Sequence, residues 1–270
     1  MPLTHYYPMI VPLYRERYLQ TIWNAEKQVN QNEGWTLKNK TWAPWFYNMR
    51  PVGDSPELFY DVCDVMAELT EKYPEVNLLT AVEMAGLLPV GGTSIVRSGN
   101  GQPVRIAYTR PLPTKVKTPE EAVIVLNELS TDVAGYGQKD FVEGRLIDGD
   151  NIGIFDDMAN DLGSKLIARL IVLWYAEQIG CSVQCDHIFY FLNRNLKTLQ
   201  TIADFPNHSN STLKPANLKV DYVIEFIEAL PLLEKVMAPA EYRVICDFQE
   251  RPEHFQDVDV QKEVLALAHK

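Results

Sequence analysis

The sequence has few cysteines, and their positions favour neither a disulfide framework nor a metal site. Four cysteines are scattered through 270 residues. Cys181 and Cys185 have the C-x3-C spacing of some metal sites, but His187 is the one further candidate ligand in the neighbouring sequence. The stretch CSVQCDHIFYFL around them is typical of a buried strand. We therefore expect reduced, structural cysteines and no protein-bound metal.

Long apolar runs, internal repeats and low-complexity tracts are also missing from the sequence. Because no run of roughly 18 apolar residues and no signal-peptide pattern occurs, we expect a cytoplasmic protein that does not bind membranes. Basic residues are outnumbered, with 25 Lys and Arg against 36 Asp and Glu, a formal net charge of −11. This balance disfavours electrostatic binding to nucleic acid, and an anionic ligand would need a local basic site.

The segment NIGIFDDMANDLGS, residues 151–164, is the most informative part of the chain. An apolar run ends at Phe155, and the carboxylates of Asp156 and Asp157 follow at once. A short polar loop and a helix beginning near Asp161 are expected next. In an α/β protein this order suits a phosphorylated sugar, because loop N–H groups and the helix N-terminus face the phosphate.

Apolar strands alternate with amphipathic helices from residue 55 to residue 195. Strands are expected at 77–82, 104–108, 151–155 and 182–192, with helices at 57–73 and 161–180. Such alternation indicates a mostly parallel sheet covered by helices on both faces, and ligands of such sheets bind at the carboxyl ends of the strands.

Residues 110–140 form a long connection between two of these strands. It opens with RPLPTKVKTPEE, whose prolines interrupt regular structure, and a short helix is expected at 120–129. Connections of this length are usually functional or mobile. The alternative is a solvated insertion without a function.

Five segments occur in the order of the motifs of orotate phosphoribosyltransferases: TLKNKTWAPWFYN, TAVEMAGLLP, AYTRP with AGYGQKDFVEG, NIGIFDDMANDLGS and FLNRN. The chain resembles that family over residues 34–195. The resemblance implies the type I phosphoribosyltransferase fold, with an N-terminal helix and hood (1–54), a core (55–205) and a C-terminal extension packed on the core (206–270). It also implies a homodimer that joins orotate to the ribose of phosphoribosyl pyrophosphate (PRPP), with Mg²⁺ bound mainly through PRPP.

The resemblance also implies roles for individual residues. Lys38 would approach the pyrophosphate or the orotate carboxylate, Phe46 and Tyr47 would cover the orotate ring, and Arg194 would hold the orotate carboxylate. Asp156 and Asp157 would contact the ribose hydroxyls. The pyrophosphate would meet Arg110, Lys139 and either Lys115 or Lys117. The remaining PRPP contacts would come from Glu83, Ala85, Gly86, Asn160, Asp161, Gly163 and Ser164.

Several positions depart from the family pattern. Ala134 stands where the family has its catalytic lysine, and Pro111 replaces a second lysine. Asp161 replaces a small residue of the phosphate loop and Leu162 its central glycine, which adds a repelling charge and removes backbone freedom. Two alternatives therefore stay open: a catalytically impaired relative that binds a nucleotide or a protein partner, and a transferase for another base.

Overall fold

The computed structural model describes residues 3–25, 33–37, 41–132, 141–194 and 218–269. The chain divides into two compact units. Unit 1 consists of Met1–Leu3 and Phe59–Val223, and unit 2 of Thr4–Leu58 and Ile224–Lys270. Within the described ranges, none of the helices combines the length and the apolar character that a membrane span requires.

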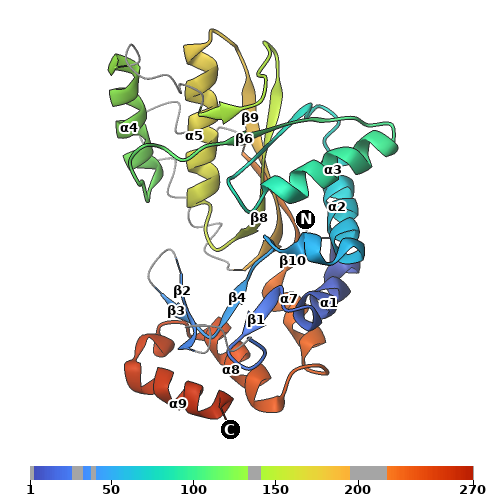
Figure 1. Ribbon diagram of the computed structural model, residues 1–270, viewed down its shortest axis with the longest axis vertical. Coiled ribbons are helices and arrows are strands. Elements are labelled where there is room, and N and C mark those ends of the chain that lie inside the picture. Colours follow the sequence, from blue (N-terminus) through green and yellow to red (C-terminus); the bar gives the residue numbers. More distant parts are fainter. Residues whose placement is uncertain (1–2, 26–32, 38–40, 133–140, 195–217, 270) are drawn as a thin grey trace. The chain divides into compact units, whose positions relative to one another are not determined.

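Unit 1 is built on a six-stranded sheet with the strand order β10-β9-β8-β5-β6-β7 (Figure 1). The strands are β5 (Leu78–Ala81), β6 (Arg105–Thr109), β7 (Val142–Glu143), β8 (Asn151–Ala159), β9 (Gln184–Asn193) and β10 (Lys219–Glu225). The pairs β5–β6, β5–β8 and β8–β9 are parallel, and β7 is antiparallel to β6. The mostly parallel sheet expected from the alternating apolar segments is confirmed.

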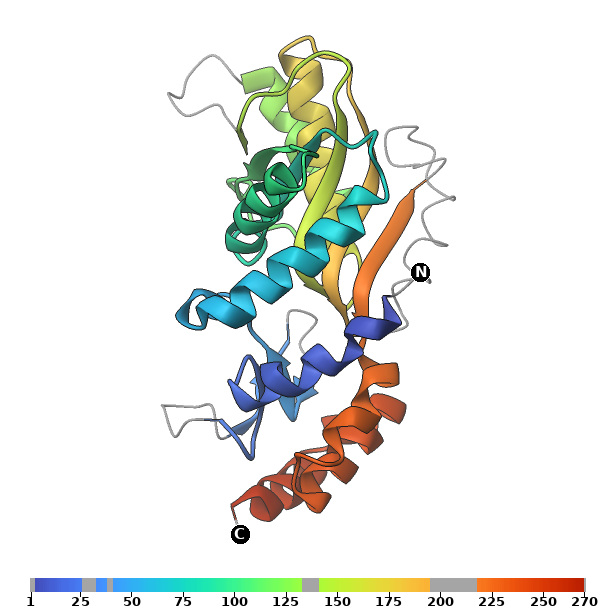
Figure 2. The same cartoon turned by 90° about the vertical axis from the view of Figure 1, so that its right-hand side faces the viewer.

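Helices cover both faces of this sheet, as predicted. They are α2 (Pro56–Glu71), α3 (Leu87–Gly99), α4 (Pro119–Asp132) and α5 (Gly163–Gln178). α4 and α5 lie on one face and α2 and α3 on the other (Figures 1 and 2). α2 begins where the sequence places a proline after Ser55, since proline suits the first turn of a helix.

The connection from β6 to β7 contains α4, which agrees with the short helix expected at 120–129. Its residues Ala122 and Leu126 are buried in the same apolar cluster as Leu166 and Leu170 of α5. Val123 and Leu129 are partly buried against that cluster. The helical part of this long connection is therefore a component of the core of unit 1.

Unit 2 combines small sheets with helices from both ends of the sequence. Its helices are η1 (Thr4–Met9), α1 (Ile10–Arg15), η3 (Val52–Asp54), α7 (Phe226–Ala229), η5 (Leu230–Leu233), α8 (Pro239–Glu250), η6 (His254–Gln256) and α9 (Val258–Ala268). Its strands are β1 (Leu19–Thr21), β2 (Trp35–Thr36), β3 (Trp42–Ala43) and β4 (Trp45–Tyr47), which form the antiparallel pairs β1–β4 and β2–β3.

A buried carboxylate connects the two ends of the sequence within unit 2. Glu241 of α8 is 2% exposed and accepts hydrogen bonds from the hydroxyls of Tyr14, at 2.9 Å, and Thr21, at 2.5 Å. Burial and the nearby Glu241 charge raise the pKa of Tyr14, so this hydroxyl stays a donor. Both donors depend on one acceptor.

Replacing Glu241 with alanine should lower the free energy of unfolding by about 2–4 kcal/mol, because the buried hydroxyl of Thr21 and the half-buried hydroxyl of Tyr14 lose their acceptor. Urea denaturation followed by tryptophan fluorescence measures the change. Glu234→Ala, at an exposed position of unit 2, is the matched control and should change the free energy of unfolding by less than about 0.5 kcal/mol. Equal losses in the two variants would contradict a structural role of the buried carboxylate.

Candidate active site

Strand β8 continues through the acidic pair. Its pairing with β9 reaches from Asn151 to Ala159, which lies opposite Asn193. The predicted strand end at Phe155 is therefore wrong, because the ladder with β9 continues for four more residues. The helix begins at Gly163 and not near Asp161. Three residues connect β8 to α5, in agreement with the short polar loop expected there.

The acidic pair is buried and its charge is compensated by a lysine. Asp156 and Asp157 are 5% and 7% exposed. The Asp156 Oδ2 atom lies 2.6 Å from the ammonium nitrogen of Lys165, in the first turn of α5. Its Oδ1 atom accepts a hydrogen bond from the backbone N–H of Asp157 at 2.9 Å. Both oxygens of Asp156 therefore have a donor from the protein itself.

Lys165 was not among the residues predicted from the sequence. It precedes Leu166 in a helix whose apolar residues face the core, and it is 4% exposed. A lysine in the buried part of a helix needs a partner of opposite charge, because an unpaired buried ammonium is costly. The sequence signal that could have indicated this contact is a charged residue beside the apolar stripe, eight residues after Asp157.

Burial, followed by the neighbouring Asp156 charge, raises the pKa of Asp157 to about 8, and the Lys165 ammonium acts in the opposite direction. At neutral pH the folded protein therefore keeps Asp157 mostly protonated. The acidic pair therefore carries less negative charge than two ordinary carboxylates, and the Lys165 ammonium compensates the charge that remains.

The turn after β5 lies against this part of β8. Gly86 is buried, and a Cβ atom there would be 2.7 Å from the Phe155 carbonyl oxygen and 3.2 Å from Asp156 Cα. Only glycine permits this approach without a shift of the backbone. Glu83 is exposed, Ala85 is half-buried, and the peptide bond between Glu83 and Met84 is cis. The structure thus brings Gly86 next to Asp156.

In the connection from β8 to α5, side chains of the connection itself occupy a backbone N–H group and a core position. The Asp161 carboxylate accepts the backbone N–H of Gly163 at 2.9 Å, so this donor is already engaged. Asn160 is half-buried, and the hydroxyl oxygen of Ser164 lies 3.3 Å from the Lys165 ammonium nitrogen. Leu162 is completely buried in the core of unit 1. Leu162 therefore has a packing role at the position where the family has glycine.

Replacing Leu162 with glycine should destabilise unit 1 by about 3–5 kcal/mol, because it empties a filled core position. Thermal unfolding by circular dichroism measures this loss. Asp161→Ser, at an exposed neighbour, is the matched control and should cost less than about 1 kcal/mol. A Leu162→Gly protein as stable as the control would contradict the packing role. The exposed Asp161 is consequently the better position for testing phosphate binding.

The structure describes some, but not all, of the basic side chains predicted to contact pyrophosphate. Arg110 follows β6 and is half-exposed, and its Nε atom lies 2.7 Å from Glu143 Oε1. Lys115 and Lys117 are exposed in the segment before α4. Lys139 falls outside the described residues. The arginine is therefore present at the carboxyl end of β6 but is paired with a carboxylate.

Arg194 lies directly after β9, beside the end of β8. Its backbone N–H donates to the Ala159 carbonyl oxygen at 2.8 Å, and the residue is 4% exposed. Burial lowers the pKa of its guanidinium to about 9. The sequence-predicted Arg194 and the acidic pair therefore belong to neighbouring strand ends of unit 1.

The predicted ring-covering residues lie on β4 in unit 2. Phe46 is half-buried and stacks on Trp35 with a centroid distance of 6.2 Å. Tyr47 is 1% exposed, so its ring belongs to the core of unit 2. Lys38 is outside the described residues.

The donor set was also tested for a metal ion. The described part of the chain contains no group of three or more His, Cys, Asp or Glu residues that could hold one. The acidic pair is matched by the Lys165 ammonium and by one proton, so it offers a cation little net charge. A magnesium ion here would need most of its oxygen ligands from a phosphorylated substrate.

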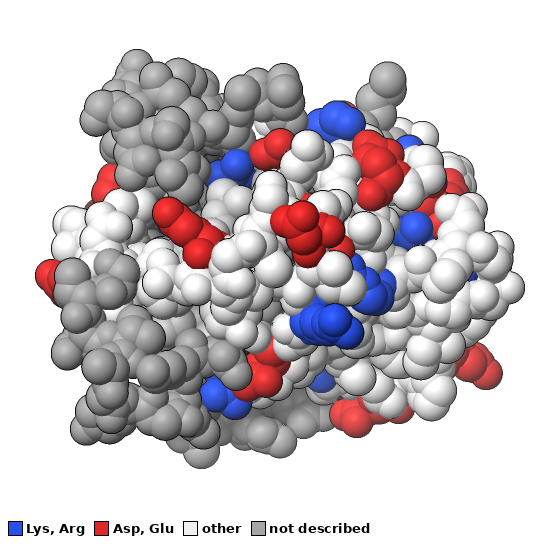
Figure 3. Space-filling model, turned by 90° about the horizontal axis from the view of Figure 1, so that it is seen from above, with Lys and Arg blue, Asp and Glu red and all other residues white. Residues whose placement is uncertain are grey.

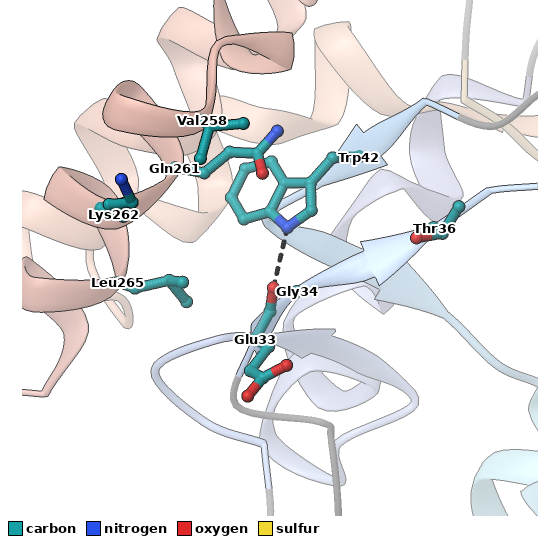
Figure 4. Close-up of a pocket in the computed structure, with 8 residues that line it drawn as sticks. All are labelled: Glu33, Gly34, Thr36, Trp42, Val258, Gln261, Lys262 and Leu265. Carbon is teal, nitrogen blue, oxygen red and sulfur yellow. Dashed lines mark hydrogen bonds between the residues drawn. The ribbon is translucent and has the colours of Figure 1, made fainter.

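Unit 2 has a cavity of about 550 Å³ (Figure 4). It is lined by Glu33, Gly34, Thr36, Trp42, Val258, Gln261, Lys262 and Leu265. The indole N–H of Trp42 donates to the Glu33 carbonyl oxygen at 2.8 Å, which fixes the ring at the cavity wall. Of the described residues predicted for PRPP or orotate, none lines this cavity.

Charged side chains of both signs are interspersed on the face drawn in Figure 3. Among the described residues visible there, the small clusters of Lys and Arg have Asp or Glu residues near them.

Comparison with known proteins identifies the fold. No protein-family model and no curated protein sequence matches the chain. The UMP synthase of Leishmania donovani superposes with a TM-score of 0.60 at 15% identity, over 91% of this chain and 42% of that one. This chain thus spans less than half the length of the Leishmania protein.

Two orotate phosphoribosyltransferases are also similar to the chain. The Francisella tularensis structure has a TM-score of 0.54 at 12% identity, covering 90% of this chain and 94% of that one. The Aeropyrum pernix structure has a TM-score of 0.51 at 13% identity, covering 84% and 97%. At these identities the likeness concerns the fold, and the protein has the type I phosphoribosyltransferase fold.

Proposed function

We propose that the protein binds PRPP and transfers its phosphoribosyl group to orotate, giving orotidine 5′-monophosphate and pyrophosphate. The observation that carries the proposal is the close approach of Gly86 to Asp156. It joins a backbone turn suited to pyrophosphate to carboxyl groups suited to ribose, at the edge of the sheet where such proteins bind ligands. The likeness to two orotate phosphoribosyltransferases, over most of their length, supports phosphoribosyl transfer, and orotate is proposed as the acceptor from the resemblance of the sequence motifs.

The reaction breaks the bond between ribose C1 and the pyrophosphate oxygen and forms a bond from C1 to a ring nitrogen of orotate. Negative charge grows on the pyrophosphate as its bond breaks, and a fixed cation there lowers the barrier. In this proposal Arg110, with Lys139 and Lys115 or Lys117, neutralises that charge. Mg²⁺ would be held mainly by PRPP oxygens. Asp156 and Asp157 stand at the ribose, where the ion pair with Lys165 limits what Asp156 contributes.

The acceptor base requires contacts of its own. Arg194 at the end of β9 holds the orotate carboxylate, since a planar guanidinium suits a bidentate contact. Lys38 and Phe46 keep the base-side roles implied by the resemblance, whereas the role implied for Tyr47 would require its ring to leave the core of unit 2. We also expect a homodimer, which light scattering of the purified protein measures.

A second candidate function is binding of a phosphoribosyl compound or a protein partner without group transfer. Two ion pairs favour it: Lys165 with Asp156, and Arg110 with Glu143. In each, a side chain needed for the transfer reaction is already engaged by another residue of the chain. The alanine at position 134 points in the same direction.

Calorimetric titration with PRPP and Mg²⁺, repeated with orotidine 5′-monophosphate, tests the proposal. We expect saturable binding of both ligands, followed by pyrophosphate release when orotate and PRPP are supplied together. Binding without turnover would select the second candidate. If neither ligand binds at millimolar concentration, both forms of the proposal are wrong. Adenine and hypoxanthine as alternative acceptors decide between orotate and another base.

A further inference from the structure

The ammonium group of Lys165 is saturated with acceptors. It lies 2.6 Å from Asp156 Oδ2 and 3.3 Å from the Ser164 hydroxyl oxygen, and it also donates to the Met158 carbonyl oxygen. An ammonium has three N–H donors, and three acceptors surround this one. The side chain is 5% exposed, so water does not replace these contacts.

This lysine stands at an unfavourable place for a cation. It occupies the first turn of α5, where the helix dipole favours negative charge. Burial of an ammonium is also costly unless a carboxylate compensates it. The contact with Asp156 offsets both effects, and so the carboxylate and the lysine hold each other in one arrangement.

The same contact limits what Asp156 can offer to a ligand. Lys165 binds the Oδ2 atom of Asp156 and the backbone N–H of Asp157 its Oδ1 atom, and the residue is 5% exposed, so the remaining lone pairs are little accessible to a ligand. A ribose hydroxyl approaching Asp156 would have to compete with a charge-assisted hydrogen bond in a buried place, which is stronger than one between neutral groups.

We propose that Lys165 is a positioning residue that withholds Asp156 from the ribose, so that the hydroxyls of a bound phosphoribosyl ligand contribute little to its affinity. The inference rests on the proposed function, since it concerns the same ribose site. As a consequence, the protein should discriminate only weakly between ribose and deoxyribose ligands, and Lys165 should be the residue responsible.

The test compares ligands that differ by one hydroxyl. Ribose 5-phosphate, 2-deoxyribose 5-phosphate and 3-deoxyribose 5-phosphate are titrated calorimetrically into the wild-type protein and Lys165→Met at pH 7. For each protein, the Kd of each deoxy ligand is divided by the Kd of ribose 5-phosphate, and the larger of the two ratios is used. This ratio measures the contribution of the missing hydroxyl, because the phosphate contributes equally to all three ligands. Lys262→Met, an exposed lysine on α9, is the matched control.

For the wild-type protein and Lys262→Met we expect a ratio below about threefold. For Lys165→Met we expect about tenfold or more, since the freed carboxylate can accept a hydroxyl. A wild-type ratio of tenfold would overturn the inference without any variant, and so would an unchanged ratio in a folded Lys165→Met protein. Absence of ribose 5-phosphate binding to every protein would instead reject the ribose site of the proposed function.

Discussion

Lys165→Met should lower the free energy of unfolding by about 3–5 kcal/mol at pH 7, because it leaves the Asp156 carboxylate buried without its cation. Methionine has nearly the length of lysine and a good helix propensity, so the change removes mainly the charge. Chemical denaturation of the two proteins measures the difference. A folded variant is expected, because natural domains are stable by about 5–15 kcal/mol.

The effect of Lys165→Met should depend on pH. Protonation removes the charge of a buried carboxylate that has no cation beside it, so the cost of leaving one unpaired in the variant falls as the pH falls. The difference between the two proteins should therefore shrink as the pH falls from 7 to 4. Lys262→Met should stay within about 1 kcal/mol of the wild type at each pH, since its partner Asp259 is exposed. A Lys165→Met difference that does not change with pH would point to lost packing and not to lost charge.

Asp157→Asn should stabilise the protein, and increasingly so as the pH rises. The folded-state pKa of Asp157 is about 8 and its ordinary value is 3.8. A carboxyl group whose pKa is raised by folding stabilises fully below the ordinary value, and this contribution is lost as the pH rises through the folded value. Asparagine does not ionise, so it avoids that loss.

The gain from Asp157→Asn should be near zero at pH 4 and reach several kcal/mol at pH 9, since one pKa unit is equivalent to about 1.4 kcal/mol. Urea midpoints at pH 4, 6.5 and 9 measure it. Asp61→Asn, at an exposed position on α2, is the matched control and should change stability by less than about 0.5 kcal/mol throughout. A constant offset between Asp157→Asn and the wild type would contradict the raised pKa. If Asp157 contacts ribose, the more stable variant should also bind PRPP more weakly.

The strands β5, β6, β8 and β9 could be predicted from the sequence because their signals are local, whereas the edge strands β7 and β10 were not expected. Each central strand is a short apolar run, and glycine or proline separates most runs from the next helix. The carboxylates at positions 156 and 157 were recognisable for the same reason, since they directly follow such a run. The carboxyl end of β8, and with it the first residue of α5, was not predictable. The pairing of Ala159 with Asn193 depends on a strand that lies far along the sequence.

The charge state of the site could not be predicted in this way. Lys165 appears in the sequence as one polar residue in an amphipathic helix, and its contact with Asp156 depends on how α5 packs on β8. The engagement of Arg110 by Glu143 depends likewise on the short antiparallel pair of β6 and β7. Such pairings join distant residues, and a single sequence contains no local pattern for them.

Unit 2 is built from two segments that lie far apart in the chain, and this separation affects how it can fold during synthesis on the ribosome. The Tyr14 and Glu241 side chains that bond within it are 227 positions apart in the chain. Contacts between such distant positions form slowly, and domains generally fold as their residues emerge. Residues 59–223 can therefore fold during translation, whereas the segment that contains Tyr14 must wait until the helix that contains Glu241 has been synthesised. During that interval the buried tryptophan and tyrosine of β4 lack their final covering, and this segment is where a chaperone would be needed.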